Sequence, residues 1–369
     1  MAPPPCPPFT ERQAFLALNA VPGLGPSARH RLLERFGGNV RAVWRHCRPD
    51  PTPEDFDPIA EEAQLRAIGA DFLVPSDPDY PPLLREIPDP PLGLYRQGRH
   101  DPGRPCVAIV GTRWASPYGR EVARKLAAEL CHLGFCVVSG LALGIDTAAH
   151  EGALAAGGPT TAVLGAGLAV IYPPENADLA RQLTGAGALL SEFPLARRPT
   201  RQSFPLRNRV VSGLCSAVVV VESAVDGGAM ITARFAGEQG RTVLAVPGRI
   251  DVATSAGCHQ LLRDGAALLG GVEDILAELS YGDRLPAGFA TAVAAPSRAH
   301  QRAEGPADGT TPEERVVLDC FRGGAILGAD LLAVRTRLGA GPLAAVLRTL
   351  ELEGRLAKQL DGRYEAIAD

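Results

Sequence analysis

The chain has 369 residues, enough for about two or three domains, and its 46% hydrophobic content excludes a predominantly disordered protein. A formal net charge of −4 excludes a uniformly basic surface, so a polyanion would need a local basic groove. Eight scattered cysteines without a CxxC pair, no secretory signal and no long apolar run predict a cytoplasmic protein with reduced thiols and no membrane span. No metal-ligand spacing is present, so neither a metal nor another cofactor is expected.

Residues 10–70 predict a small domain of short helices. Within it, VPGLGPSARHRLLERFGG places Gly23 and Gly25 in a tight turn before an amphipathic run. This SAM/helix-hairpin-helix-like pattern lets backbone N–H groups approach a phosphate. Two interpretations stay open, namely phosphate binding and a module that only packs or docks.

Residues 71–104 predict an extended connector. The prolines between Ser76 and Arg99 exclude a long helix and a central strand there.

Residues 105–280 alternate short apolar segments with helical ones. Strands are expected at CVAIV, FCVVS, TTAVL, ALLS, AVVVVES and TVLAVP. Helices are expected from Tyr118 to Leu133, after Gly144, and from Ile231 to Gln239. This alternation predicts an α/β fold with a mostly parallel sheet covered on both faces.

The C-terminal third divides into a predicted linker and a small domain. Residues 281–309 lack apolar periodicity and predict a flexible linker. In residues 310–369, Thr311 is expected to cap a helix that begins at Pro312, and two more helical runs follow. A hairpin with Asp361 and Gly362 at its turn completes a winged-helix-like pattern.

Ligands of open α/β sheets bind at the carboxyl ends of the strands, so the loops there are the first candidates for a site. Gly111, Thr112 and Arg113 follow the first strand of this domain, where N–H groups and a helix dipole attract an anion. Neither GxGxxG nor GxxxxGK[ST] occurs, which excludes a P-loop ATPase. The turn at residues 165–167 is expected to be structural.

Asp146, His150 and Glu222 are the other polar candidates. Asp146 and His150 lie four residues apart at a helix start, which would suit a catalytic or metal pair, but no third partner is visible. Asp146 satisfying backbone N–H groups is the alternative. Glu222 ends an apolar strand, and a hydrogen bond to a neighbouring loop is expected.

The segment ARRPTRQSFPLRNR, residues 196–209, contains five arginines, one aromatic residue and no acid. It is expected to be a loop on the same sheet edge as the glycine-rich loops. Arginines beside an aromatic ring are typical of a groove for single-stranded DNA. The alternative is a solvated loop whose arginines pair with nearby acids.

Several motifs occur in the order found in one family. They include VAIVGTRWASPYG, VVSGLALGIDTAAHEGAL, SEFP, FPLRNRVVSGL and AVPG, and together they cover most of residues 76–279. On these motifs the chain resembles the bacterial DNA-processing protein A (DprA/Smf) family. The resemblance implies a Rossmann-like core that dimerises, binds single-stranded DNA without sequence specificity and loads the RecA recombinase during natural transformation, with no catalytic activity.

By matching positions, the resemblance implies DNA contacts from Arg113, Arg201 and Phe204. Gly111 and Thr112 join them as the anion-binding turn, Ser139, Gly140 and Gly144 as the wall, and Arg207, Asn208 and Arg209 as the rest of the basic loop. The chain departs from the family at residues 227–229, where Gly-Gly-Ala replaces the usual Ser-Gly-Ser, and at His259, where an Asn is common. Backbone N–H groups could substitute for the missing serine hydroxyls.

Two other functions are compatible with this kind of fold. Nucleotide-cleaving phosphoribohydrolases share this kind of core and carry PGGxGTxxE, whereas DGGAMITARF here lacks the Gly-Thr pair and the catalytic carboxylate. A transcriptional regulator would read duplex DNA through the winged helix. The expected recognition helix contains one arginine, Arg348, and two acids, Glu351 and Glu353. This composition favours a C-terminal domain that docks to protein or has only a structural role.

Overall fold

The computed structural model describes residues 9–21, 23–47, 56–281, 311–321, 326–336, 338–359 and 362–367. Contacts divide the chain into two compact units, one of residues 1–114 and 123–292 and one of residues 115–122 and 293–369. The predicted linker at residues 281–309 lies, apart from Tyr281, outside the described residues.

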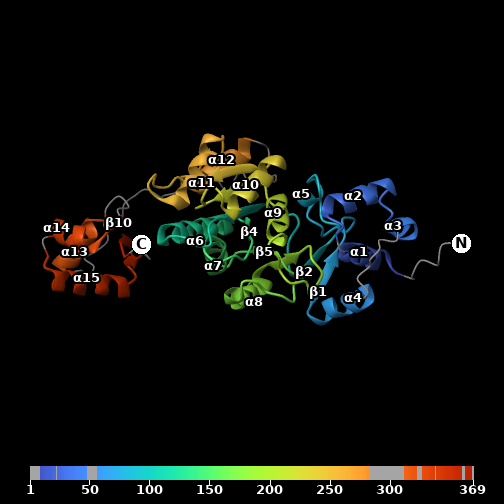
Figure 1. The fold of residues 1–369 in the computed structure, drawn as a ribbon, viewed down its shortest axis with the longest axis horizontal. Helices are drawn as coiled ribbons and strands as arrows, with labels where there is room; N and C mark the ends of the chain where they lie inside the picture. Colours follow the sequence, from blue (N-terminus) through green and yellow to red (C-terminus); the bar gives the residue numbers. More distant parts are fainter. Residues whose placement is uncertain are drawn as a thin grey trace. The chain divides into compact units, whose positions relative to one another are not determined.

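Four helices open the larger unit, as expected: α1 (Glu11–Ala20), α2 (Pro26–Arg35), α3 (Val40–Cys47) and α4 (Pro58–Ala67) (Figure 1). A capping box between Thr10 and Gln13 starts α1. Gly23 adopts a φ of +72° in the turn before α2, a conformation that favours glycine. These helices bury their apolar faces in a cluster that also contains Leu189 of the sheet, so they pack against the sheet rather than forming a core of their own.

A nine-stranded sheet forms the centre of the larger unit, in the order β1-β2-β6-β5-β4-β3-β7-β8-β9. Pairing is parallel from β6 to β9 along the sheet, whereas β2 runs antiparallel to both of its neighbours, β1 and β6. The prediction of a mostly parallel α/β sheet is therefore confirmed. The strands are β1 (Ala70–Leu73), β2 (Leu94–Gly98), β3 (Cys106–Val110), β4 (Cys136–Ser139), β5 (Thr160–Leu164), β6 (Ala188–Ser191), β7 (Ala217–Val220), β8 (Thr242–Ala245) and β9 (Ala267–Leu268).

The exclusion of a central strand between Ser76 and Arg99 is wrong. Strand β2 lies inside the sheet, paired with β1 on one side and β6 on the other. The last proline of this segment is Pro91, so residues 94–98 keep every N–H group that an inner strand must donate. Before them, residues 82–85 form the short helix α5 (Pro82–Arg85).

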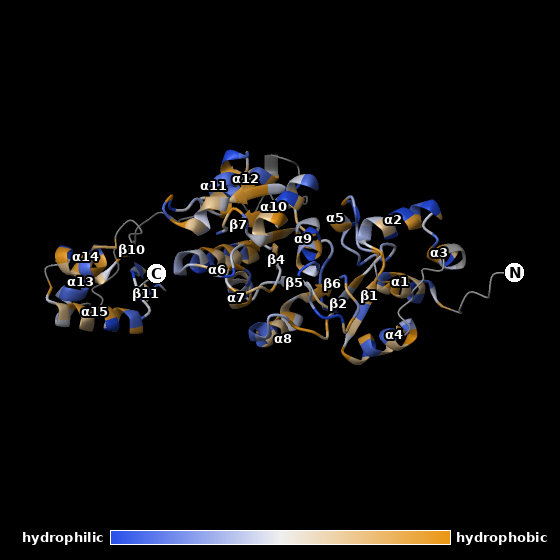
Figure 2. Ribbon diagram, in the orientation of Figure 1, coloured by the Kyte–Doolittle hydropathy of each residue, from blue (hydrophilic) through white to orange (hydrophobic). Residues whose placement is uncertain are grey.

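Helices cover both faces of the sheet. One apolar cluster joins the N-terminal helices and α8 (Ala177–Ala186) to one face, and a second joins α5, α9 (Ser203–Gly213), α10 (Gly228–Glu238) and α11 (Ala256–Arg263) to the other. Figure 2 shows hydrophilic and hydrophobic residues interspersed along these helices, as amphipathic helices on a sheet require. The remaining helices are α6 (Pro117–His132), α7 (Ile145–Ala155) and α12 (Val272–Tyr281), with short 3₁₀ turns at Pro174–Asn176 and Ala253–Ser255.

The expectation that residues 196–209 form a loop is wrong for its second half, which belongs to helix α9. Residues 203–213 are helical, so Phe204, Arg207, Asn208 and Arg209 lie on a helix, and only residues 196–202 remain a loop. Pro205 falls in the first helical turn, where its missing N–H group has no intrahelical acceptor, so it does not interrupt the helix.

The C-terminal residues form the predicted winged-helix pattern. Its helices are α13 (Pro312–Asp319), α14 (Ala329–Thr336) and α15 (Ala340–Leu352), and its antiparallel sheet has the order β10-β12-β11 (Ile326–Leu327, Tyr364–Ala366 and Leu356–Lys358). Thr311 caps α13 in a capping box with Glu314. Of the predicted turn pair, Gly362 has a φ of +84°, and Asp361 lies outside the described residues. No helix in the described ranges is both long and apolar enough to cross a membrane.

Two helical glycines should respond oppositely to the same substitution. A Cβ at Gly152 in α7 would lie 2.3 Å from the carbonyl oxygen of Arg124 in α6, so Gly152→Ala should destabilise the protein by about 1–3 kcal/mol. At Gly237 in α10 nothing lies within 4 Å, so Gly237→Ala should stabilise by up to about 1 kcal/mol through helix propensity. Urea unfolding followed by circular dichroism measures both. Equal effects of the two substitutions would contradict the close packing of α7 on α6.

Candidate functional site

A cavity of about 290 Å³ lies at the carboxyl ends of the central parallel strands. Strand β3 pairs with β4 on one side and β7 on the other, which is the switch point where open α/β sheets bind ligands. Of the residues predicted for the site, the cavity is lined by Gly111, Thr112, Arg113, Gly140, Phe204, Arg207 and Asn208. Ser139, Gly144, Arg201 and Arg209 are not among its lining residues.

Close backbone packing shapes the floor of the cavity. A Cβ at Gly111 would lie 2.5 Å from a side-chain atom of Ile145 and 2.9 Å from the Glu222 carbonyl oxygen. The N–H of Thr112 donates to that same carbonyl oxygen at 2.7 Å, which joins the loop after β3 to the end of β7. Gly144 has a φ of +80°, and a Cβ there would lie 2.3 Å from the Thr112 carbonyl oxygen. Glycine is therefore required at both positions for the loops to meet.

Asp146 and Arg207 form a buried polar group at the back of the cavity. The Asp146 carboxylate accepts hydrogen bonds from the N–H groups of Gly140 at 3.0 Å and Ala142 at 3.3 Å. Arg207 donates to the carbonyl oxygens of Gly140 and Val163. Burial lowers the pKa of Arg207 to about 10 and raises the pKa of Asp146, while each charge favours the ionised form of the other. The interpretation of Asp146 as a partner of backbone N–H groups is thus confirmed.

His150 is enclosed rather than exposed to a ligand. Its Nδ1 lies 2.7 Å from the Thr160 hydroxyl, which itself donates to the Val137 carbonyl oxygen at 2.9 Å. Nδ1 therefore carries the proton, and Nε2 is buried without a hydrogen-bond partner. Burial, together with the Arg207 charge, lowers the pKa of His150 to about 3, so the ring is neutral at pH 7.

Aromatic and cationic side chains meet at the mouth of the cavity. The Arg113 guanidinium lies 5.4 Å from the centroid of the Phe204 ring, and the Tyr172 ring lies 5.6 Å from it at a tilt of 46°. Gly165 leaves room for this ring, since a Cβ there would lie 2.8 Å from Phe204 Cδ1. Trp114, which is not among the residues predicted for the site, also lines the cavity and is 79% exposed. Its position directly after the GTR motif was the signal that could have identified it.

The N-terminus of α10 contributes the opposite wall. Gly227, Gly228 and Ala229 line the cavity, and no side chain caps this helix end. Its first N–H groups are therefore able to bind an anion. Asn208 spans the cavity wall by donating to the Gly228 carbonyl oxygen at 3.2 Å. His259, which stands where the family usually has Asn, is not among the residues that line this cavity. Its Nε2 lies 2.9 Å from the Gly248 carbonyl oxygen.

The loop before α9 carries exposed positive charge. Arg197, Arg198 and Arg201 are exposed, and the Arg197 guanidinium lies 5.1 Å from the Phe193 ring centroid. The turn at residues 165–167 holds this loop, because the Gly167 N–H donates to the Arg197 carbonyl oxygen at 2.9 Å. The expectation that this turn is structural is confirmed.

Arg209 and Ser139 are enclosed by protein. Arg209 is 1% exposed, lies 2.7 Å from the Glu192 carboxylate and has its Nε 3.1 Å from Asp89. The Ser139 hydroxyl is buried and donates to the Ile109 carbonyl oxygen at 2.6 Å. Both side chains join elements beneath the site.

The N-terminal helices hold the segment that leads into the basic loop. Asn19 donates to the Glu192 carbonyl oxygen at 2.7 Å, and the Leu195 N–H donates to the Glu61 carboxylate at 2.6 Å. Arg29 in turn donates to the Asn19 side-chain oxygen at 3.0 Å. Burial raises the pKa of Glu61, and its hydrogen bond from Leu195 acts in the opposite direction.

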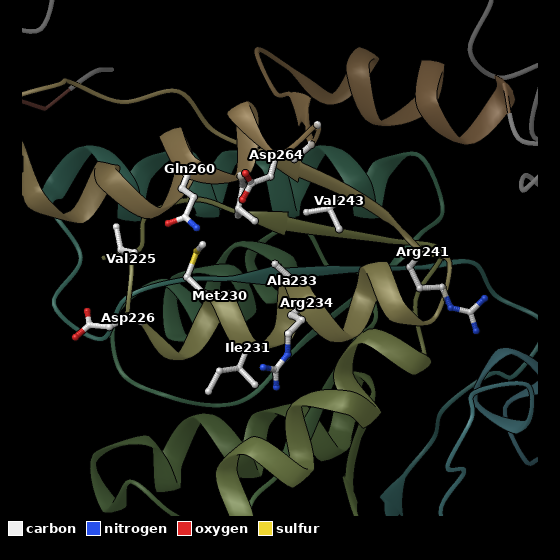
Figure 3. Close-up of a pocket in the computed structure, with 14 residues that line it drawn as sticks. Val225, Asp226, Met230, Ile231, Ala233, Arg234, Arg241, Val243, Gln260 and Asp264 are labelled. Carbon is white, nitrogen blue, oxygen red and sulfur yellow. The ribbon is translucent and has the colours of Figure 1, made fainter.

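A larger cavity of about 630 Å³ lies on another side of α10 (Figure 3). Met230 and Ile231 of α10 line it with Gln260 and Asp264, and Figure 3 shows Arg234 from the same helix alongside them. None of the predicted site residues lines this cavity. Across the part of the chain that the structure describes, no group of three or more His, Cys, Asp and Glu side chains could hold a metal.

Comparison with known proteins identifies relatives over nearly the whole chain. Residues 71–280 match the family model of DNA recombination-mediator protein A, and residues 301–362 match the DprA winged helix domain. Protein Smf of Synechocystis sp. is 36% identical over 397 residues, covering 96% of this chain and 99% of that protein.

Two solved structures share the fold. The X-ray structure of DNA processing protein A from Streptococcus pneumoniae has a TM-score of 0.65 at 33% identity and covers 73% of this chain and 99% of the solved one. The second is the structure of DNA processing protein A from Helicobacter pylori, which was solved to describe how that protein binds single-stranded DNA. It has a TM-score of 0.52 at 30% identity. It covers 58% of this chain and 96% of the solved one.

Removing the buried Arg209 charge should cost far more stability than removing an exposed one. Arg209→Met leaves the Glu192 carboxylate, which is 4% exposed, without its ion-pair partner, so we expect a loss of about 3–5 kcal/mol in the free energy of unfolding. Arg181→Ala removes an ion pair whose side chains are both 78% exposed and should cost at most about 1 kcal/mol. Urea titration compares them, and a loss below 1 kcal/mol for Arg209→Met would refute its structural role.

Proposed function

The chain belongs to the DNA recombination-mediator protein A (DprA/Smf) family, as its motifs predicted, and from this premise we propose that it binds single-stranded DNA in the cytoplasm without sequence specificity. It then loads the RecA recombinase onto that DNA in natural transformation or DNA processing. It does so as a homodimer formed through the Rossmann-like core, without a cofactor and without catalysing a reaction itself.

The observation that carries this proposal is the Arg113–Phe204 contact at the mouth of the glycine-lined cavity. It places a guanidinium, an aromatic ring and the uncapped N-terminus of α10 around one recess. Phosphate binds to guanidinium groups and to helix N-termini, and bases bind to aromatic rings. None of these contacts depends on base identity, which supports binding without sequence specificity.

The predicted residues take two kinds of role in this proposal. Arg113 and Arg201 are exposed and contact phosphates, with Thr112, Gly111 and Gly140 presenting the backbone of the recess. The other predicted residues, which are buried or half-buried, act by positioning these contacts. They are Ser139, Gly144, Arg207, Asn208 and Arg209, with Phe204 supporting Arg113.

A net charge of −4 agrees with this function because the charge is unevenly distributed. Arg207 and Arg209 are balanced by buried carboxylates, whereas Arg197, Arg198 and Arg201 are exposed on one loop. Local positive charge is sufficient to attract a phosphate backbone at moderate salt.

The phosphoribohydrolase alternative gains no support from the cavity. Among the described residues that line it, Asp146 is the one carboxylate, and its Oδ2 already accepts two backbone hydrogen bonds. A base that works on a substrate needs a free lone pair directed at it. Release of a free base from nucleoside monophosphates by the purified protein would restore this alternative.

We expect single-stranded DNA to bind more tightly than its duplex, and loss of Arg113 or Arg201 to flatten the salt dependence. Each phosphate contact on a single strand contributes about 0.7 to the slope of log affinity against log salt, so Arg113→Ala and Arg201→Ala should each lower the slope by roughly that amount. Phe204→Ala should weaken binding and lower the slope by less than this amount, because Arg113 keeps its charge but loses the ring that orients it. Fluorescence anisotropy of a labelled oligonucleotide across a salt series measures both.

Arg181→Ala is the matched control, because it removes an exposed arginine of α8 that is absent from the cavity lining. Equal binding of duplex and single strand, or cavity variants that match this control, would contradict the proposed site.

The RecA step has a separate test. Addition of the protein should speed RecA filament formation on an oligonucleotide coated with a single-strand-binding protein, and Arg113→Ala should abolish that acceleration. Sedimentation of the protein at micromolar concentration should give the mass of a dimer. Single-strand binding without any effect on RecA would leave a DNA-binding protein that is not a loader.

A further inference from the structure

Trp114 occupies an unusual position for a tryptophan. The chain has two tryptophans, and the other one, Trp44, is 9% exposed and donates its indole N–H to the Ala14 carbonyl oxygen at 2.9 Å. Trp114 is 79% exposed, although burying a tryptophan is among the most favourable contributions to a core. Its backbone is nonetheless anchored, because its N–H lies 3.2 Å from the Thr112 hydroxyl. An anchored, exposed indole at a cavity mouth is suited to a ligand.

The Phe204 ring is already engaged by protein. Arg113 lies 5.4 Å from its centroid, Tyr172 lies 5.6 Å away, and Gly165 lies so close that a Cβ there would meet Cδ1 at 2.8 Å. These neighbours cover part of the ring, and Phe204 is half-buried. Trp114, in contrast, lines the same cavity with most of its surface exposed.

We propose that Trp114 is the stacking platform for a base of the bound single strand, next to the phosphate that Arg113 holds. This inference rests on the proposed function and adds a binding residue to it. Arg113 and Trp114 are consecutive in the chain, so a phosphate on the guanidinium brings a neighbouring base within reach of the indole. The two aromatic residues then have different roles, since Phe204 orients Arg113 and Trp114 contacts the base.

The first test uses affinity. Trp114→Ala should weaken binding of an oligo-dT by about 5- to 150-fold, the range that corresponds to loss of one base–aromatic stack, with an unchanged salt slope. Trp114→Phe should recover most of the affinity because it keeps a ring. Ile59→Ala, which shortens an apolar side chain that is 51% exposed on α4, is the control and should bind like the parent.

An abasic oligonucleotide separates base contacts from phosphate contacts. Trp114→Ala should bind a base-free strand as well as the parent does, whereas Arg113→Ala should weaken binding of both strands. Equal losses for Trp114→Ala on the abasic strand and on oligo-dT would overturn the stacking assignment.

Fluorescence provides a direct readout. In a Trp44→Phe background Trp114 is the sole tryptophan, and stacking of a thymine on it should quench its emission as oligo-dT is added. Binding detected by anisotropy without quenching, and with unchanged affinity of Trp114→Ala, would overturn the Trp114 proposal and leave the proposed function standing. If the parent protein binds no oligo-dT by anisotropy, the proposed function itself fails, and the Trp114 proposal with it.

Discussion

The buried ion pair between Arg209 and Glu192 is the interaction on which the arrangement of the site depends. Arg209 lies on α9, and Glu192 directly follows β6, so the pair closes the basic loop between them. The same Glu192 accepts a hydrogen bond from Asn19 of the first helix through its backbone carbonyl. One residue thus joins the sheet, the helix that carries Phe204 and the N-terminal helices. The charges satisfy each other there, which is the condition under which buried ions are tolerated.

Above this pair, burial decides which arginines are available to a ligand. Arg207 is held by two backbone carbonyl oxygens beside Asp146, and Arg209 by Glu192, so both serve the protein's own structure. Arg113 is different, because it lies over an aromatic ring at a cavity mouth. The arginines in FPLRNR therefore serve the protein's own packing, while the exposed ones in the preceding loop are accessible to a ligand.

Much of the fold was predictable from local patterns, and so were several cavity residues. Short apolar runs predicted strands β3 to β8. The glycines that follow these strands predicted the edge of the sheet at which the cavity lies. The two errors have different causes, because prolines precede β2, whereas the start of α9 was expected to lie in the connection that follows β6. Proline excludes regular structure only where its missing N–H would be needed. The position of Trp114 directly after the GTR motif could have indicated that it lies at the site, but its exposure could not be derived, because exposure depends on what packs around the side chain.

By itself the sequence determined the order of the elements, the parallel core, the glycine-rich edge and the family, because each of these depends on patterns of residues that are close together in the chain. Tertiary structure alone decided the pairing of Arg209 with Glu192, the contact of Asn19 with a carbonyl 173 residues away, and the contacts of Phe204 with Arg113 and Tyr172. Those contacts join distant segments, and an arginine has the same letter whether it is buried or exposed. Its role is set by the desolvation and the partners that the folded chain provides.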